Sequence, residues 1–325
     1  MYVHVHVLTF GNHEFEGRNN AYLLSDTGTV TLVDTGIATP RIREQFATEL
    51  HERGLGFADI DQIVLTHWHP DHTGLAGDIQ AQSGATVYVH EADAPLVRRD
   101  PDALDELHDR QRVYFDEWGI PPAAQDELRS ALADDHLVGQ PPTVQSIAEG
   151  ATIDGGARDL RVLHAPGHAA GLCCFAFDGD SGREAFVGDA ILPKYTPNVG
   201  GADARVDAPL ATYLDTLERL ANQEFARVWP GHRDVIENPT ARAREIIAHH
   251  RERASRILDI LREAGPADAW TVSAHLFGEL EGIHILHGPG EAYAHLDHLD
   301  RHGLVERTED GYRVRPERPA LEAIM

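Results

Sequence analysis

The segment from Thr66 to Thr73 reads Thr-His-Trp-His-Pro-Asp-His-Thr and follows an apolar stretch. It places three imidazoles and one carboxylate close together, on His67, His69, Asp71 and His72. Two histidines separated by one residue at a strand end can point at one centre, and the Asp-His pair after them can point at a second. Imidazole nitrogens and carboxylate oxygens are the usual ligands of Zn²⁺. The segment therefore predicts a metal-dependent enzyme whose remaining ligands lie elsewhere in the chain.

Four further positions repeat the same pattern. Each is a histidine or an aspartate that follows an apolar segment and lies beside glycine, which lets the backbone turn sharply at a sheet edge. They are Asp34 in Leu-Val-Asp-Thr-Gly, His168 in Ala-Pro-Gly-His, Asp189 in Val-Gly-Asp-Ala and His232 in Trp-Pro-Gly-His. Together with the first segment, they predict one metal centre assembled at the ends of several strands.

This set of residues resembles the metallo-β-lactamase superfamily over nearly the whole N-terminal part of the chain. The family's His-x-His-x-Asp-His signature is matched by residues 67–72, and its later ligands by His168, Asp189 and His232. The resemblance implies an αββα sandwich with two metals at one edge. It further implies that His67, His69 and His168 hold one zinc, that Asp71, His72 and His232 hold the other, and that Asp189 bridges them. Asp34 matches a family position that orients a ligand without binding metal.

Two metals suggest a hydrolytic mechanism. They can share a water whose pKa falls toward about 7, and they can stabilise the charge that develops on a carbonyl or phosphoryl oxygen. We expect attack by metal-bound hydroxide, with Asp71 as a proton carrier and no serine or cysteine nucleophile. The expected cofactors are two Zn²⁺ ions, with iron or manganese as the alternative.

The charge of the chain is strongly acidic and its basic residues are unevenly chosen. The formal net charge is −25, and Lys194 is the single lysine. Such acidity keeps a protein soluble and resembles the composition of haloarchaeal cytoplasmic proteins; an acidic protein from a high-GC genome is the alternative. Nonspecific binding to a phosphate backbone is disfavoured by this charge.

The cysteines and the hydropathy pattern bear on the compartment. Cys173 and Cys174 are neighbours in a predicted strand, where successive side chains point to opposite faces, so they are poorly placed to pair. No apolar run approaches the roughly 18 residues of a membrane span, and the first ten residues do not form a signal peptide. These observations predict a cytoplasmic protein without disulfides or a membrane anchor.

The predicted fold class is α+β, an αββα sandwich at residues 1–240 followed by a small winged-helix domain at residues 241–325. Apolar segments between turn residues predict strands at residues 2–10, 20–25, 29–34, 60–66, 85–90, 160–164, 172–178, 184–187 and 227–229. Helices are predicted between Thr39 and Gly54, over residues 73–83 and over residues 210–220. A helical insertion over residues 91–136, broken at residues 119–122, is either a lid or scaffold.

The C-terminal part predicts three helices and a terminal hairpin. A long helix ends at Gly265, Thr271 caps a short helix over residues 272–277, and a third helix spans about residues 291–302. The third helix is acidic for a recognition helix, although the hairpin carries four arginines, Arg307, Arg313, Arg315 and Arg318. The histidines of this part are interpreted as ordinary polar positions, namely His249, His250, His275, His284, His287, His295, His298 and His302.

Three functions remain open at this point. The first is a dinuclear zinc hydrolase of a small ester, thioester or lactone. The second is a single-strand-specific ribonuclease or other phosphodiesterase, since the winged helix resembles the branch that contains beta-lactamase-like protein 2. The third is an oxidoreductase with a single iron, similar to persulfide dioxygenases. Lys194 and Tyr195 follow Asp189 closely enough to reach a substrate. A small molecule is the expected partner, and a homodimer remains open.

Overall fold

The computed structural model describes residues 5–11, 17–25, 28–132, 135–156, 158–316 and 321. Tyr2 in the first predicted strand and Arg318 in the predicted hairpin lie outside the described residues. Among those that are described, no helix is both long and apolar enough to cross a membrane.

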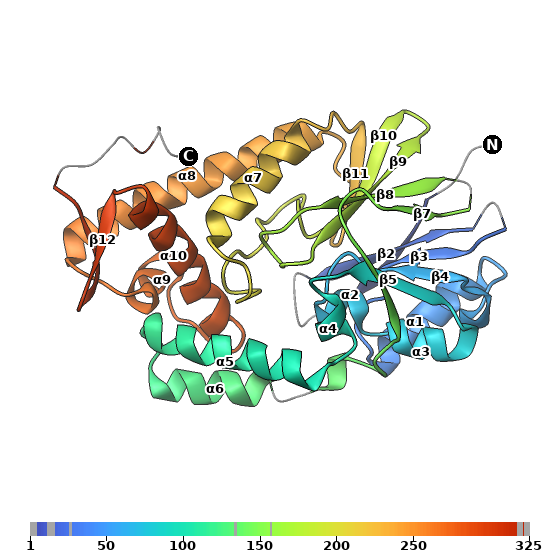
Figure 1. The fold of residues 1–325 in the computed structure, drawn as a ribbon, viewed down its shortest axis with the longest axis horizontal. Coiled ribbons are helices and arrows are strands. Elements are labelled where there is room, and N and C mark those ends of the chain that lie inside the picture. Colours follow the sequence, from blue (N-terminus) through green and yellow to red (C-terminus); the bar gives the residue numbers. More distant parts are fainter. Residues whose placement is uncertain are drawn as a thin grey trace.

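Two sheets form the centre of the N-terminal part (Figure 1). The first sheet has the order β1-β2-β3-β4-β5-β6, with antiparallel pairs up to β3 and parallel pairs from β3 onward. Its strands are β1 His6–Gly11, β2 Arg18–Leu24, β3 Thr31–Val33, β4 Gln62–Val64, β5 Thr86–His90 and β6 Val144–Ile147. The second sheet has the order β11-β10-β9-β8-β7, and only its β10–β11 pair is parallel. Its strands are β7 Thr152–Asp154, β8 Asp159–His164, β9 Cys173–Gly179, β10 Gly182–Gly188 and β11 Arg227–Pro230.

Successive side chains of these strands point to opposite faces of their sheet. The two sheets therefore separate three apolar layers, one between them and one on each outer face. Val64 packs between the two sheets, whereas its neighbour Ile63 faces the outer helices of the first sheet. In the second sheet, Cys173 faces the other sheet and Cys174 faces the outer helices. The prediction that the two cysteines point to opposite faces is therefore confirmed, and both thiols are free and buried.

Helices cover the outer face of each sheet, which confirms the predicted αββα arrangement (Figure 1). The first sheet packs against α1 Pro40–His51 and α3 Ala76–Ser83, and the second packs against α7 Pro209–Ala221 and the first turns of α8 Pro239–Ala264. Thr39 caps α1 as predicted, because its side chain accepts from the backbone N–H of Ile42.

The helical insertion and the C-terminal part share one apolar core. The insertion contains α4 Ala94–Val97, α5 Pro101–Glu117 and α6 Pro122–Leu132, and the C-terminal part contains α8, α9 Ala269–Phe277, α10 His284–Arg301, β12 Val305–Thr308 and β13 Gly311–Val314. Phe115, Trp118 and Leu128 of the insertion are buried against Leu258 of α8 and Leu296 of α10. The insertion is therefore packed as scaffold against the C-terminal helices.

Several element boundaries differ from the predictions. The helix predicted over residues 73–83 is two helices, α2 Pro70–Thr73 and α3, and the short strands β6 and β7 were not predicted. Asp268, not Thr271, caps α9, since its carboxylate accepts from the Thr271 N–H at 2.7 Å. The third C-terminal helix begins at His284 and includes Pro289.

Candidate metal centre

All seven predicted ligands and Asp34 lie just beyond the carboxyl ends of five strands. Asp34 follows β3, the segment His67–His72 follows β4, His168 follows β8, Asp189 follows β10 and His232 follows β11. The parallel pairs β3–β4 and β10–β11 direct these ends to the same edge. Gly231 is required there, because a Cβ at this position would collide with Asp189 and His72.

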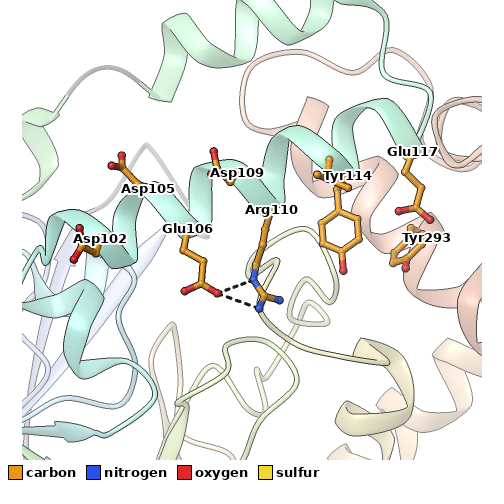
Figure 2. Close-up of a pocket in the computed structure, with 9 residues that line it drawn as sticks. Asp102, Asp105, Glu106, Asp109, Arg110, Tyr114, Glu117 and Tyr293 are labelled. Carbon is orange, nitrogen blue, oxygen red and sulfur yellow. Dashed lines mark hydrogen bonds and ion pairs between the residues drawn. The ribbon is translucent and has the colours of Figure 1, made fainter.

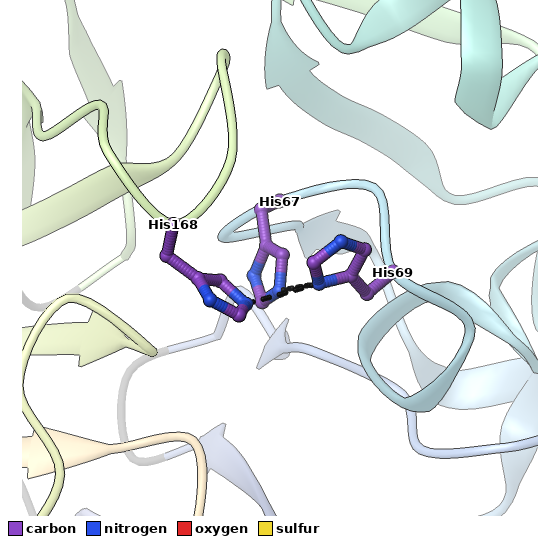
Figure 3. Close-up of side chains that lie close together, drawn as sticks. All are labelled: His67, His69 and His168. Atoms are coloured by element: carbon purple, nitrogen blue, oxygen red, sulfur yellow. Dashed lines mark hydrogen bonds between the residues drawn. The ribbon is translucent and has the colours of Figure 1, made fainter. Parts of the chain in front are cut away.

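The first group of ligands consists of three imidazoles, His67, His69 and His168, here called the histidine triad (Figure 3). The Nδ1 atom of His69 lies 2.9 Å from Nε2 of His67 and 3.0 Å from Nε2 of His168. Three nitrogens that converge so closely are arranged as ligands of one ion.

The second group contains one carboxylate and two imidazoles, Asp71, His72 and His232, here called the mixed triad. Oδ2 of Asp71 lies 3.8 Å from Nε2 of His72 and 3.4 Å from Nε2 of His232. The same carboxylate oxygen accepts a hydrogen bond from Nδ2 of Asn19 at 3.1 Å. The mixed triad is therefore a separate set of donor atoms beside the first.

Asp189 lies between the two triads. Its Oδ2 is 3.7 Å from Nε2 of His168 in the histidine triad and 3.3 Å from Nε2 of His232 in the mixed triad. Its Oδ1 is 3.6 Å from Nε2 of His72. This contact with both groups is the arrangement that a bridging carboxylate requires.

Each of the five imidazoles hydrogen-bonds outward, so that its other nitrogen faces the centre. His72 Nδ1 donates to Asp34 at 2.8 Å and His168 Nδ1 to the Asn198 carbonyl at 2.8 Å. The remaining outward partners are Thr66 Oγ1 for His67, the Ala202 carbonyl for His69 and the Arg18 carbonyl for His232. We assign the tautomers from these contacts, which orient metal-binding histidines in general.

Asp34 is placed by an unusual backbone conformation. Its φ is +60°, which non-glycine residues rarely adopt. In this position its two oxygens accept from the Thr66 N–H at 2.8 Å, from Thr66 Oγ1 at 2.8 Å and from His72. Asp34 thus holds the first metal-binding segment from outside, through its contacts with Thr66 and His72.

The two triads differ in protonation. Burial lowers the pKa of His69 to about 4 and also lowers the pKa of His67 and His168, so these rings are neutral at pH 7. For His232, burial is outweighed by Asp189 and Asp71, which raise its pKa to about 10. Carboxylates raise the pKa of His72 in the same way. Protons therefore occupy the mixed triad where a cation would otherwise balance its carboxylates.

Unpaired buried atoms indicate that the centre fits metal ions. Nε2 of His72, Nε2 of His232 and Oδ1 of Asp189 are buried, and none finds a hydrogen-bond partner among the described residues. Buried polar atoms are rarely left in this way, and the Nε2 atoms of His72 and His232 both lie beside the Asp189 carboxylate. The histidine triad would hold one ion and the mixed triad would hold a second. Asp189, which contacts both triads, would lie between them.

A buried ionic clamp, which the sequence analysis missed, joins the loops of the histidine triad. Asp93 accepts from the N–H groups of Trp68 at 3.1 Å and Gly171 at 2.9 Å. Asp203 accepts from Trp68 Nε1 at 3.1 Å and from the Ala170 N–H at 2.9 Å, while Arg205 pairs with both carboxylates. The loops carrying His67, His69 and His168 are thus tied together from behind.

Helix α10 also supports the histidine triad. Glu291, which is buried, accepts from the Val199 N–H at 3.0 Å and from Asn198 Nδ2 at 3.3 Å, and the Asn198 carbonyl in turn holds His168. Gly201 and Gly290 approach so closely that a Cβ on Gly290 would collide with the Gly201 backbone. The wall behind His168 is therefore built partly from the C-terminal helices.

The C-terminal histidines are not all ordinary polar positions, so that interpretation was wrong. His250, His295 and His298 are buried, and His250 Nδ1 lies 3.2 Å from His295 Nε2. His250 and His295 join Glu291 in a cluster that links α8 to α10. The ion pair of Arg253 with Glu291 already places a cation on this carboxylate, so the cluster is interpreted as part of the helix packing.

Lys194 and Tyr195 lie outside both triads, at the exposed tip of the loop between β10 and α7. The Lys194 ammonium is 5.1 Å from the centroid of the Tyr195 ring. The structure therefore brings together all the predicted ligands and places these two residues at the periphery.

A separate cavity of about 730 Å³ follows one face of α5 (Figure 2). Its lining includes Asp102, Asp105, Glu106, Asp109, Arg110, Val113, Tyr114 and Glu117 of α5, with Tyr293 of α10. Glu106 pairs with Arg110 in this lining. Because none of the predicted ligands contributes to it, the cavity is distinct from the metal centre.

Comparison with known proteins identifies the family. The sequence profile of the metallo-beta-lactamase superfamily matches residues 15–232. The chain belongs to this superfamily. Membership and the His/Asp groups together support a metal-dependent hydrolase.

Relatives and a solved structure extend the match. The chain is 30% identical to lactamase-like protein aptB of Emericella nidulans over 76% of its length, but it spans only 62% of that relative. It is 28% identical to the probable metallo-hydrolase YqjP of Bacillus subtilis, covering 88% of this chain and 89% of the relative. A crystal structure of a metallo-beta-lactamase family protein from Thermus thermophilus aligns with TM-score 0.82 and 33% identity, covering 96% of this chain and 98% of the other.

Two other relatives carry more specific names. A protein of Passalora fulva named atrochrysone carboxyl ACP thioesterase is 25% identical over 77% of this chain, which covers 59% of the relative. A beta-lactamase-like protein 2 homolog of Drosophila melanogaster is 28% identical over 74% of this chain, which covers 66% of the relative.

Proposed function

We propose that this chain is a dinuclear zinc hydrolase of a small ester, thioester or lactone, with a thioester as the favoured class. The observation that carries this proposal is Asp189, whose Oδ2 lies within 3.7 Å of His168 and 3.3 Å of His232, one in each triad. A single-metal enzyme has no need of the mixed triad with its unpaired buried nitrogens.

The zinc ions would supply a water of lowered pKa and would polarise the carbonyl of the substrate. The protein's own groups orient the centre. Outward hydrogen bonds fix each imidazole, and Asn19 holds one oxygen of Asp71 through a 3.1 Å hydrogen bond. Asp71 lies in the mixed triad and is the group we expect to carry a proton to the leaving group.

The thioester class is favoured by one relative and by the chemistry of the bond. The Passalora fulva relative is named atrochrysone carboxyl ACP thioesterase. A thiolate leaves more readily than an alkoxide, so a thioester depends less than an oxygen ester on proton transfer from Asp71 to its leaving group.

RNA cleavage is the second candidate, since beta-lactamase-like protein 2 homologues are among the relatives. The observed packing favours a small molecule instead. Glu291, His295 and His298 of the predicted recognition helix are buried in the protein. In the hairpin, Arg307 pairs with Glu117 and Arg313 with Glu306. These groups are engaged within the chain and would have to be released before they met a phosphate backbone.

The test is a substrate panel on protein loaded with zinc in molar KCl. It contains an acyl thioester, a lactone, an aryl ester, a phosphodiester and single-stranded RNA. We expect the thioester to have the highest kcat/KM. RNA cleavage faster than any acyl transfer would establish the second candidate in its place.

Metal analysis provides an independent check. Protein purified without chelators should contain two equivalents of metal, and replacement His232→Ala should reduce this to one and remove most turnover. One iron and no zinc per wild-type chain would favour the single-iron oxidoreductase.

A further inference from the structure

Trp68 lies between two ligands of the histidine triad, and three apolar clusters meet on its ring. The ring packs against the outer core of the first sheet, the outer core of the second sheet and a small cluster that contains Leu107 of α5. The Arg205 guanidinium lies over the ring, 5.6 Å from its centroid. At this residue, both outer cores and the helical insertion therefore contact the segment that carries His67 and His69.

Both N–H groups of Trp68 are bound by the buried ionic clamp, which consists of Asp93, Asp203 and Arg205. Asp93 accepts from the backbone N–H of Trp68 at 3.1 Å, and Asp203 accepts from its indole Nε1–H at 3.1 Å. Both carboxylates are buried. Two charge-assisted hydrogen bonds thus fix the position of Trp68 in addition to its packing.

The same two carboxylates hold the loop of the third imidazole. Asp203 accepts from the Ala170 N–H and Asp93 from the Gly171 N–H, both at 2.9 Å. These N–H groups lie two and three residues after His168 in the chain. A Cβ at Gly171 would collide with the Asp93 carboxylate, so this close approach requires glycine.

Arg205 joins the two carboxylates of the clamp. Its guanidinium donates to Asp203 through Nε at 2.9 Å and to Asp93 through Nη2 at 2.7 Å, and Nη1 donates to the Ala92 carbonyl at 2.6 Å. Burial lowers the pKa of Arg205, but the hydrogen bonds and charges of the two carboxylates outweigh burial and raise this pKa above its ordinary value. A planar guanidinium serves these three partners at once, which the ammonium of a lysine does not.

The clamp also reaches the outward partner of His69. Ala202, whose carbonyl lies 3.0 Å from His69 Nε2, directly precedes Asp203. Asp203 further accepts from the backbone N–H of Arg205 at 2.9 Å, which fixes the segment in which these residues lie. The three imidazoles of the histidine triad come from two separate loops (Figure 3). Each is nevertheless connected to the clamp through a residue one or two positions away in the chain.

We propose that Trp68 and the clamp are positioning residues, which fix the spacing of the three imidazoles of the histidine triad and thereby set the geometry and affinity of that metal position. The inference rests on the proposed two-metal hydrolase, since a metal must occupy the triad for this spacing to matter. The positioning residues act through the imidazoles and not on the substrate. The mixed triad is independent of them, because Asp34 and the Arg18 carbonyl hold His72 and His232.

The test uses Arg205→Lys, which keeps the positive charge but loses the planar fork that joins both carboxylates. Co²⁺ is the probe, because its visible absorption reports the coordination geometry and chelator competition gives its affinity. Each measurement is made in the full-length wild type and again with His232→Ala, which leaves the histidine triad as the occupied position. We expect Co²⁺ affinity at the histidine triad to fall about 10- to 100-fold, with a changed spectrum. Affinity at the mixed triad should stay the same.

A second variant and a matched control accompany Arg205→Lys. Trp68→Phe keeps an aromatic ring beneath Arg205 but cannot donate to Asp203, and we expect affinity at the histidine triad to fall about tenfold. Arg158→Lys is the matched control, because Arg158 pairs with Asp180 at 2.8 Å and its side chain is 16% exposed, against 17% for Arg205. The control should change neither affinity nor the spectrum.

Ile153→Ala separates positioning from loss of stability. Ile153 of β7 is buried between the two sheets and pairs with Leu160, near the start of β8 and away from the end that leads to His168. Its truncation lowers the melting temperature by leaving a cavity. The Co²⁺ spectrum and both affinities should nevertheless remain those of the wild type.

The outcomes separate this inference from the proposed function. If the wild type binds two Co²⁺ while Arg205→Lys and Trp68→Phe keep its spectrum and affinities, the positioning role is overturned and the two-metal centre is upheld. An equal loss of affinity at both triads overturns the positioning role as well. Trp68→Phe decides the test alone where Arg205→Lys does not fold. A wild type that binds no Co²⁺ refutes the proposed function, and the inference with it.

Discussion

The histidine triad and the mixed triad lie side by side but are supported differently. The first consists only of imidazoles, two of which hydrogen-bond to carbonyls in the 198–202 segment, which rests on α10. The second is held by Asp34 and Asn19, which follow or belong to strands of the first sheet. The histidine triad thus depends on packing between distant parts of the chain, and the mixed triad depends on the sandwich.

The two triads also differ in the protonation of their histidines. Burial keeps the histidine triad neutral, whereas carboxylates hold protons on the rings of the mixed triad. A metal that enters the mixed triad must displace these protons, and one that enters the histidine triad displaces none near pH 7. The two positions should therefore respond differently to pH and to distant mutations.

Replacing the side chain that joins the triads should have the largest effect. Asp189→Asn removes the negative charge between them, and we expect kcat/KM to fall by about 10³-fold or more with loss of one metal equivalent. Kinetics and metal analysis measure both quantities. Asp180→Asn, on the turn between β9 and β10, is the matched control and should change neither. Two retained metals with normal turnover would refute a joint role for Asp189.

Acidification should empty the mixed triad first. The raised pKa of His72, and the value of about 10 for His232, mean that metal affinity there falls as pH decreases from 9 to 6. We expect about a tenfold loss per pH unit for each proton displaced. The histidine triad should change little over the same range, because the pKa of His69 is about 4. Chelator competition at several pH values measures both affinities, and identical pH slopes would contradict the distinction.

Asp34→Asn should weaken the mixed triad selectively. Asparagine tolerates the positive φ at this position but removes the charge that holds the Nδ1 proton of His72. We expect metal affinity at the mixed triad to fall about 10- to 100-fold, as for other partners of ligating histidines. Chelator competition with Asp78→Asn as control would measure this loss. A larger loss at the histidine triad would reverse the assignment of Asp34.

The difference between local support and support from distant parts of the chain also explains which parts of the site could be predicted from sequence. His67, Asp71, His168 and Asp189 are marked by local patterns, because each follows an apolar strand and lies near a turn. Asp93 also follows a strand, β5, but no adjoining histidine or glycine distinguishes it from an ordinary turn residue. Its role is to accept from backbone groups of two distant loops, and only the folded chain brings these loops together.

The same limit applies to the fold. Long strands such as β9 and β10 were predicted because they are apolar, whereas β6 is short and half of it is exposed. The start of α10 was placed too late because Gly288, Pro289 and Gly290 resemble a helix break. In the structure these residues are buried, and Gly290 allows the close contact with Gly201. Tertiary packing thus overrides the local propensity there.

The smallest predicted effect tests the link through α10. Glu291→Gln keeps an acceptor near the Val199 N–H but removes the charge that balances Arg253. The segment holding the Asn198 carbonyl should loosen, and with it His168. We expect metal affinity at the histidine triad to fall about tenfold, with the mixed triad nearly unchanged.

Two readouts distinguish positioning from general destabilisation. Chelator competition measures each affinity, and the visible absorption of the Co²⁺-substituted protein reports the geometry around His168 independently of turnover. Glu279→Gln, an exposed change near the end of α9, is the matched control. A variant that unfolds at a lower temperature but keeps its Co²⁺ spectrum and both affinities would show that Glu291 stabilises α10 alone. The histidine triad would then be as independent of the C-terminal helices as the mixed triad is.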